Sequence, residues 1–197
     1  MKSRIVVFVS LITFGICKVG AVSDEAQQPT LADYTLGEKW VWKFKGVTSE
    51  GIVRADDVDM KEVVSSDGML YLAGESTKVP LMEVVQPETS ATPRFSWPLK
   101  VGKRWIFEQT WTSQDGTTGK SRFDAEVVSF KPEHVDAGTF MAYTIIYTGK
   151  ITNSRGYSAD TDEIFWYAPA TKNFIKLIQT QQDYVYEEEL VDYVKPE

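Results

Sequence analysis

The chain has few of the side chains from which most catalytic and metal sites are built. Among 197 residues there is one cysteine, Cys17, and one histidine, His134. One histidine is too few for a histidine-based metal site, and no Gly-x-Ser-x-Gly nucleophile elbow is present to complete a Ser-His-Asp triad. A phosphate-binding loop and a dinucleotide fingerprint are missing as well. We therefore expect no catalytic residue, metal ion or cofactor, and we interpret His134 as a surface loop residue.

The chain also lacks an excess of positive charge. It carries 21 Lys and Arg against 28 Asp and Glu, for a formal net charge of −7. A cleaved N-terminal leader would take Lys2, Arg4 and Lys18 with it, which changes −7 to −10. Because an acidic protein is repelled by phosphate backbones and by anionic lipid surfaces, this balance disfavours nucleic acid and membrane surfaces as partners.

The first residues have the pattern of an export signal. Lys2 and Arg4 precede an apolar run over residues 5–16, which is shorter than the ~20 residues that a membrane-spanning helix needs. Small residues follow at Gly20 and Ala21. We predict a signal-peptide helix over residues 1–21 with cleavage after Ala21, a periplasmic or secreted protein, and no transmembrane span in the mature chain. An uncleaved N-terminal anchor or a buried strand is the alternative.

Cys17 opens a second route of processing. It lies at the end of the apolar run, where a bacterial lipoprotein has its lipidated cysteine, although Ile16 fits poorly at the preceding position. Lipid anchoring at Cys17 is therefore an alternative to cleavage after Ala21. Cleavage after Ala21 would leave no cysteine, and an exported domain without disulfides suits a bacterial periplasm.

The remaining chain has the pattern of an antiparallel β protein. Short runs of β-branched and aromatic residues alternate with turn signals such as Ser66-Asp67-Gly68, where the Asp-Gly step supplies the positive φ that a hairpin needs. We predict a flexible segment over residues 22–33 and a single all-β domain over residues 34–197. The expected fold is an antiparallel barrel-like or half-barrel meander of roughly ten strands, because closure protects strand edges.

One segment pair is similar within the chain. Residues 36–42 and 101–107 share the order apolar, glycine, charged, basic, tryptophan, apolar, aromatic. Two interpretations stay open: an internal duplication, or a common way of entering a strand from a turn.

Aromatic side chains are the strongest candidates for a binding site. In-register stripes can line a ligand cavity, or they can fill the core of a barrel or sandwich. The candidate ligand-binding residues are Trp40, Trp42, Trp105, Phe107, Trp111, Tyr143 and Trp166. The leading hypothesis is an exported, non-catalytic domain that binds an apolar small molecule or an envelope protein.

Acidic clusters support an alternative function. One cluster lies over residues 56–59 and another over residues 160–163, but neither has the spacing of a calcium-binding loop. The run Glu187–Glu189 is typical of a solvated or edge-protecting strand. A hydrolase acting on envelope polysaccharide through two carboxylates is therefore one alternative. A purely structural or interaction module is another.

Three short motifs in the second half suggest a resemblance. They are Val101-Gly102-Lys103-Arg104-Trp105, residues 136–143 with the sequence Asp-Ala-Gly-Thr-Phe-Met-Ala-Tyr, and Phe165-Trp166-Tyr167-Ala168-Pro169. Their order, spread over residues 98–180, resembles a loosely defined group of exported bacterial β-rich envelope proteins. The resemblance implies a β fold and an envelope location, and it implies no catalytic residue.

Overall fold

The computed structural model describes residues 25–196. The predicted signal peptide over residues 1–21, its cleavage point at Ala21 and the alternative lipidation site at Cys17 lie outside the described residues. None of the helices in residues 25–196 is long and apolar enough to cross a membrane. The elements are β1 (Glu25–Ala26), η1 (Leu31–Asp33), β2 (Lys39–Thr48), β3 (Val53–Ser66), β4 (Met69–Ala73), β5 (Lys78–Pro80), α1 (Leu81–Val84), β6 (Leu99–Lys100), β7 (Arg104–Thr112), β8 (Thr118–Val135), β9 (Gly138–Asn153), β10 (Ser158–Ala168), β11 (Asn173–Gln181) and β12 (Tyr184–Val194).

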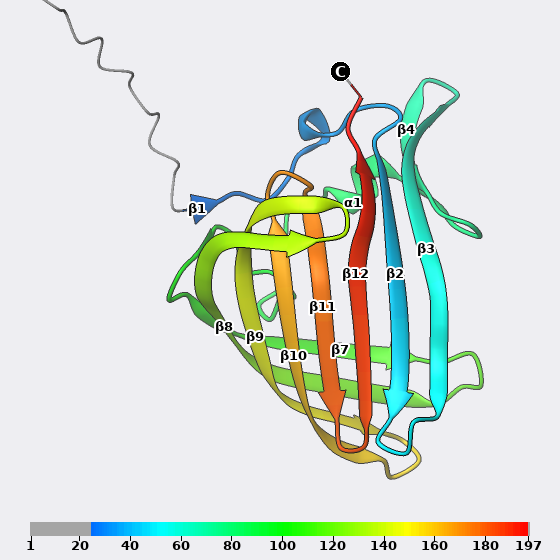
Figure 1. The fold of residues 1–197 in the computed structure, drawn as a ribbon, viewed down its shortest axis with the longest axis vertical. Helices are drawn as coiled ribbons and strands as arrows, with labels where there is room; N and C mark the ends of the chain where they lie inside the picture. The colour runs from blue at the N-terminus through cyan, green and yellow to red at the C-terminus, as the bar shows by residue number, and fades with distance from the viewer. Residues whose placement is uncertain (1–24, 197) are drawn as a thin grey trace, which may run out of the picture.

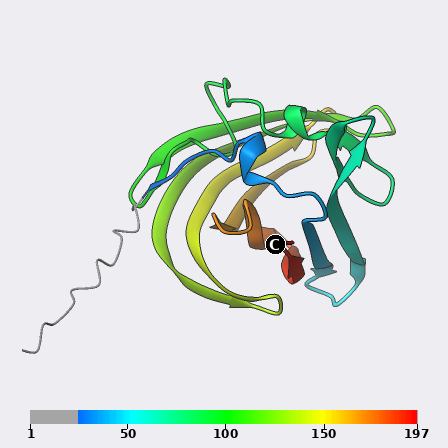
Figure 2. The same cartoon turned by 90° about the horizontal axis from the view of Figure 1, so that it is seen from above.

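Ten of these strands form one antiparallel sheet, in the order β5-β4-β3-β2-β12-β11-β10-β9-β8-β7. The sheet curls strongly, so that one face is concave (Figures 1 and 2). The edge strands β5 and β7 do not pair with each other, so the sheet is a half-barrel and not a closed barrel. The predicted all-β, antiparallel fold of about ten strands is therefore confirmed.

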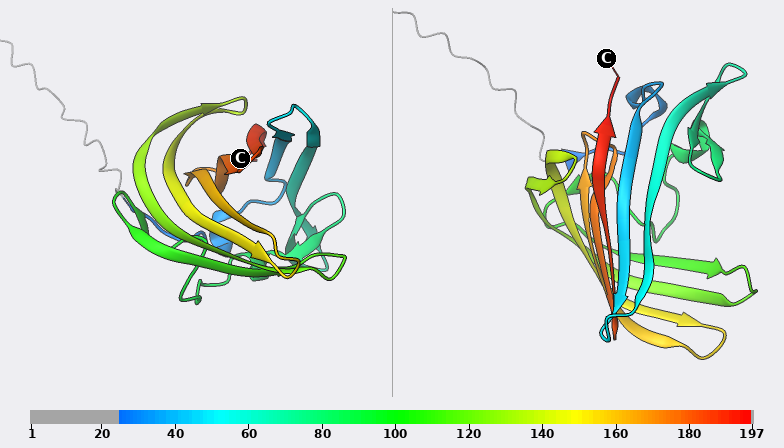
Figure 3. Two further views of the ribbon diagram at one scale, coloured as in Figure 1. Left: turned by 90° about the horizontal axis from the view of Figure 1, so that it is seen from below. Right: turned by 45° about the vertical axis from the view of Figure 1, so that its right-hand side comes forward.

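The two ends of the domain meet in the middle of this sheet. Strand β2 pairs with β12, and the chain runs from there to β5 on one side and from β7 back to β12 on the other. Strands β7 and β8 lie at a large angle to β2 and β3 (Figure 3), as the cumulative twist of a long sheet requires. Gly149 of β9 permits a close approach to β8, because a Cβ there would lie 2.0 Å from the carbonyl oxygen of Arg122.

Buried side chains form two clusters. Alternate residues of β8, such as Phe123, Ala125 and Val127, are buried while their neighbours are more exposed. This period of two is the one expected of strands with a single buried face. The first cluster gathers on β7–β10, and the second gathers around Trp40 and Trp42 of β2.

Two irregular segments lie across the concave side at the upper end of Figure 1: the N-terminal segment 25–34 and the connection 85–98. Strand β1 pairs with β6. The side-chain amide of Gln28 joins the two segments, because it donates to the Gln86 carbonyl at 2.6 Å and accepts from the Glu88 N–H at 2.9 Å. Gln28 is thus held against the connection, and the predicted flexible segment over residues 22–33 stays a prediction.

The two similar segments adopt the same turn. Gly37 and Gly102 have φ values of 82° and 85°. The Gly37 N–H donates to the Val63 carbonyl at 2.8 Å, and the Gly102 N–H donates to the Val127 carbonyl at 2.8 Å. Each valine N–H in turn donates to the backbone carbonyl of the residue after the glycine, at 2.8 Å for Glu38 and 3.0 Å for Lys103. The hairpins β2–β3 and β7–β8 therefore begin with equivalent hydrogen bonding.

Candidate ligand-binding site

A cavity of about 300 Å³ lies between the two irregular segments and the concave face. We call it the mouth cavity. Its volume is at the lower end of the range for small-molecule sites, roughly 300–1,000 Å³. Five aromatic side chains line it, and they come from four separate parts of the chain: Tyr34 from the N-terminal segment, Trp40 from β2, Phe95 and Trp97 from the connection, and Tyr167 from β10.

Three of these aromatic side chains contact one another. The ring centroids of Phe95 and Trp97 are 5.7 Å apart, and both rings lie within 5.4 Å of the Tyr167 ring. Such distances are favourable for tilted aromatic pairs. Burial raises the pKa of the Tyr167 phenol far above its usual value, so this side chain is neutral at physiological pH. The aromatic wall is therefore a packed and uncharged surface.

Three cationic side chains also line the cavity: Lys61, Arg94 and Lys172. Each has a carboxylate partner. Lys61 Nζ lies 3.4 Å from Asp59, Arg94 pairs with Glu163, and Lys172 pairs with Glu38. The cations thus belong to three ion pairs of very different burial.

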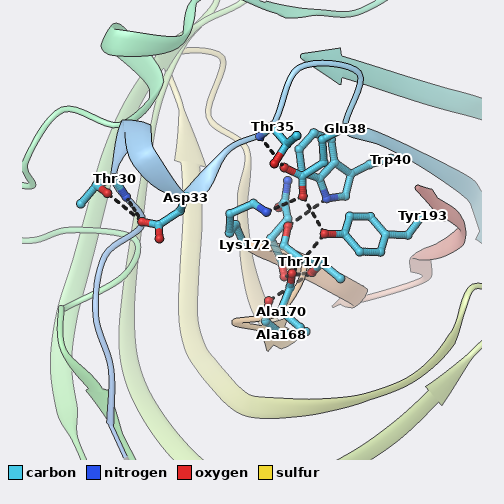
Figure 4. Close-up of polar contacts among 11 residues, drawn as sticks. Thr30, Asp33, Thr35, Glu38, Trp40, Ala168, Ala170, Thr171, Lys172 and Tyr193 are labelled. Carbon is cyan, nitrogen blue, oxygen red and sulfur yellow. Dashed lines mark hydrogen bonds and ion pairs between the residues drawn. The ribbon is translucent and has the colours of Figure 1, made fainter. Parts of the chain in front are cut away.

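The pair of Glu38 and Lys172 is the most buried. Glu38 is fully buried, and the side chain of Lys172 is 5% exposed. The carboxylate of Glu38 also accepts from the Tyr193 hydroxyl at 2.6 Å and from the Thr35 N–H at 3.2 Å (Figure 4). Burial and the neighbouring Glu38 raise the pKa of the Tyr34 phenol to about 12. This network joins the start of β2, the β10–β11 turn and β12.

Arg94 anchors the connection to the sheet. Its guanidinium lies 4.3–4.9 Å from the ring centroids of Phe107, Tyr147 and Phe165. The backbone carbonyl of Arg94 accepts from the Tyr147 hydroxyl at 2.5 Å. Its partner Glu163 is 3% exposed and accepts a second hydrogen bond from Gln179 at 2.7 Å. Since the cation-π contacts and the ion pair act on one side chain, this part of the cavity wall is well fixed.

The structure brings one of the seven predicted binding residues, Trp40, to the mouth cavity. The other six lie elsewhere: Trp42 stacks on Phe174, Trp105 packs at a right angle to Tyr147, Phe107 and Tyr143 belong to the first core cluster, Trp111 covers Gly119, and Trp166 packs against the second cluster. A ligand role for these six stays a prediction.

Sequence reasoning missed four of the five cavity aromatics. Tyr34 lies in the predicted boundary of the domain, and Phe95 and Trp97 lie between prolines in the irregular connection. The signal that could have found the latter two is the pair itself, because two large aromatic side chains in an irregular segment need a surface to cover. Tyr167 alternates with Phe165 on β10 and was not separable from the core by its pattern.

The other candidate groups of the sequence are placed as follows. His134 is exposed, but it lies on strand β8 and not in a loop, where its Nδ1 is 3.1 Å from the Thr139 hydroxyl. Within residues 25–196, no group of three or more His, Cys, Asp or Glu side chains is arranged to hold a metal ion. The run Glu187–Glu189 lies on β12, which pairs with β11 and β2. The run is thus central in the sheet and does not protect an edge.

Comparisons with family models and with curated proteins give no match. Among solved structures, the chain is similar to "a putative lipoprotein" from Parabacteroides distasonis, with a TM-score of 0.52 and 11% identity over 86% of this chain and 99% of that chain. Two others are an exported protein of Bacteroides fragilis, described as having a YmcC-like fold (TM-score 0.45, 10% identity, 87% of this chain and 100% of that chain covered), and the hypothetical lipoprotein YmcC from Escherichia coli (TM-score 0.36, 12% identity, 90% and 91% covered). At these identities the likeness concerns the fold alone, and the first structure carries it.

Proposed function

We propose that the protein is an exported, non-catalytic binding domain that holds a small, partly apolar ligand in the mouth cavity. The observation that carries this proposal is the convergence of five aromatic side chains from four parts of the chain on one cavity. The cavity wall is continuous with the core, because Phe95 and Trp97 pack against the first cluster and Tyr34 packs against the second.

The way in which the walls are held supports binding. The side chain of Gln28 holds the two irregular segments together by hydrogen bonds, and the ion pair of Arg94 with Glu163 fixes the connection to the sheet. A site that is ordered before the ligand arrives loses less conformational entropy on binding. The cavity volume, about 300 Å³, suits one ring system or a short chain.

Export is the second element of the proposal. The N-terminal sequence has the charged region, apolar run and small residues of a signal peptide. Two of the similar structures are named as lipoproteins and one as an exported protein. A bacterial envelope location is consistent with both, and so is membership of the exported β-rich group that the three motifs resemble. Processing after Ala21 or lipid anchoring at Cys17 is decided by mass spectrometry of the mature N-terminus.

The binding test is a fluorescence titration of the mature protein with 1-anilinonaphthalene-8-sulfonate, followed by displacement with small aromatic and short-chain compounds. We expect saturable one-site binding in the wild type and at least a tenfold loss in Trp97→Ala, which removes a cavity wall. Phe44→Ala is the matched control, because Phe44 lies outside the mouth cavity and packs against Tyr186. Equal loss in both variants, or no saturable binding by the wild type, would contradict the proposal. Binding of an envelope protein and the carboxylate-based hydrolysis stay predictions.

A further inference from the structure

Lys172 has an unusual backbone for a lysine. Its φ is +56°, in the left-handed region that glycine, asparagine and aspartate adopt more easily. A strained residue of this kind persists where the surrounding structure holds it in place. Lys172 also lies on the wall of the mouth cavity, with a side chain that is 5% exposed.

The ammonium group of Lys172 has donors to spare. A lysine ammonium carries three N–H donors, and within the described residues its one hydrogen-bond acceptor is Glu38. The same Nζ lies 5.2 Å from the ring centroid of Tyr34 and 5.8 Å from that of Trp40. These ring faces attract the positive charge, but they do not accept a directed hydrogen bond from its N–H groups. A nearly buried donor without an acceptor is costly, so an acceptor in the cavity would stabilise it.

A second ammonium group lines the same cavity, and its Nζ lies 5.6 Å from the ring centroid of Trp42, the next tryptophan along β2. Lys61 is the cross-strand partner of Trp40 on β3, and it also lines the mouth cavity. Its Nζ is 3.4 Å from Asp59, and the two side chains are 39% and 37% exposed. This exposed pair is weak, because solvent screens it. Lys61 can therefore turn to a ligand at small cost.

Acidic groups oppose an anion in the cavity only weakly. Among the described lining residues, Glu88 is the one carboxylate. Its Oε1 accepts from the Ser90 N–H at 2.6 Å, so it is engaged with its own loop. Glu38 lies behind Lys172 and is fully buried. The cavity thus presents two ammonium groups beside an aromatic wall.

On the basis of the proposed function, we infer that the ligand of the mouth cavity is anionic: a small molecule with an aromatic or short acyl body and one carboxylate or phosphate group. The anionic group accepts hydrogen bonds from Lys172 and Lys61, which both line the cavity. The body of the ligand packs against Phe95, Trp97 and Tyr167.

Calorimetric titration of the mature protein with 2-naphthoate, 2-naphthyl phosphate and 2-naphthol tests this inference, because the three probes share a ring system and differ in charge. We expect at least one anionic probe to bind about tenfold or more tightly than the alcohol at low salt, since charge-assisted hydrogen bonds are the stronger ones. The preferred anion identifies carboxylate or phosphate as the natural group. Equal affinity for all three overturns the inference and leaves the cavity function intact, whereas no binding of any probe contradicts the proposed function as well.

Two variants locate the charge. Lys61→Gln removes one ammonium without touching the buried pair, and we expect it to reduce the preference for the anion several-fold. The double variant Glu38→Gln/Lys172→Met removes the second ammonium together with its counter-charge, which keeps the buried charge balanced. Lys120→Gln, on the exposed face of β8, is the control and should leave the preference unchanged. Retention of the full preference by both Lys61→Gln and the double variant would overturn the assignment.

Discussion

The hairpins β2–β3 and β7–β8 begin alike and finish differently. Each starts with a glycine at positive φ, and each then packs a tryptophan into one of the two core clusters. The indole N–H of Trp40 donates to the Thr171 carbonyl at 2.9 Å, and that of Trp105 donates to the Pro93 carbonyl at 2.9 Å. The acceptor lies in the β10–β11 turn in the first case and in the connection in the second. The same local pattern is thus completed by unrelated parts of the chain.

The residue after the glycine makes the larger difference. In the first hairpin it is Glu38, which is fully buried and paired with Lys172. In the second it is Lys103, which donates to the Pro98 carbonyl at 2.9 Å. Burial lowers the pKa of Lys103, and the charge of Glu25 partly opposes this. A buried ion pair therefore stabilises the start of the β2–β3 hairpin, whereas the connection covers the start of the β7–β8 hairpin. The mouth cavity lies beside the start of the β2–β3 hairpin, where this ion pair is.

The largest expected effect concerns this ion pair. Lys172→Met leaves the carboxylate of Glu38 buried without its cation, and breaking a buried pair in this way costs about 3–5 kcal/mol. Lys103→Met, at the corresponding end of the other hairpin, should cost less than about 1.5 kcal/mol, because it removes one neutral-acceptor hydrogen bond. Urea unfolding of both variants gives the comparison.

The double variant Glu38→Gln/Lys172→Met should recover most of the loss in Lys172→Met, since it removes both charges together. Similar losses of unfolding free energy for Lys172→Met and Lys103→Met would show that the starts of the two hairpins are stabilised equally. The comparison between the two hairpins would then be wrong.

The two tryptophans provide the next largest effect. Trp40→Phe removes a buried indole and its hydrogen bond, and we expect a loss of about 2–3 kcal/mol. Trp105→Phe should cost about 1–2 kcal/mol, because Trp105 is only partly buried. The free energy of unfolding measures both. If Trp105→Phe proved the more damaging, the connection would contribute more to stability than the β10–β11 turn does.

Local patterns predicted the parts of this architecture that depend on neighbouring residues. The alternation of Trp40 and Trp42 predicted a buried face, and both are at most 2% exposed. The Asp67-Gly68 turn was predicted from its sequence, and both residues have positive φ. The pairing of β2 with β12 could not be predicted in this way, because it depends on cross-strand contacts between distant segments.

The binding site was harder to predict than the fold for the same reason. Glu38 and Lys172 are 134 residues apart, and neither is distinctive in its own segment. A period of two shows which face of a strand is buried, but it does not show whether the space beside that face is filled. Trp40 and Trp42 alternate identically, and yet Trp40 borders the mouth cavity while Trp42 stacks on Phe174.

The two glycines should behave alike. An alanine at Gly37 or Gly102 would have to adopt a left-handed backbone, at a cost of roughly 1–2 kcal/mol each. A Cβ at Gly37 would lie 3.3 Å from Pro196 Cγ, and a Cβ at Gly102 would meet no atom within 4 Å. Since a contact of 3.3 Å requires the Pro196 ring to shift by only a few tenths of an ångström, we expect the two losses in urea unfolding to agree within about 0.5 kcal/mol. An alanine tolerated at only one position would show that the turns are not equivalent.

The smallest expected effect compares two acids on the concave face. The carboxylate of Glu163 pairs with the cation of Arg94 and accepts a hydrogen bond from Gln179. The carboxylate of Glu188 accepts a hydrogen bond from the Tyr186 hydroxyl at 2.9 Å. Burial raises the pKa of the Glu188 carboxyl, the Tyr186 hydrogen bond opposes this, and Asp59 adds to the rise. A carboxyl whose pKa is raised on folding favours the folded state while it is protonated, and this contribution is lost as the pH rises through the folded pKa. Glu188→Gln should therefore raise the melting temperature slightly at pH 7 and have little effect at pH 3.

Glu163→Gln is the matched control, and it should lower the melting temperature at pH 7, because it leaves Arg94 without its carboxylate. Thermal unfolding of the two variants at pH 3 and pH 7 separates these cases. A stabilised Glu163→Gln, or a Glu188→Gln whose benefit is independent of pH, would mean that charge burial does not distinguish the two halves of the concave face. The opposite signs at pH 7 would instead show that ionic compensation is complete on the side of the connection and incomplete beside β2 and β3.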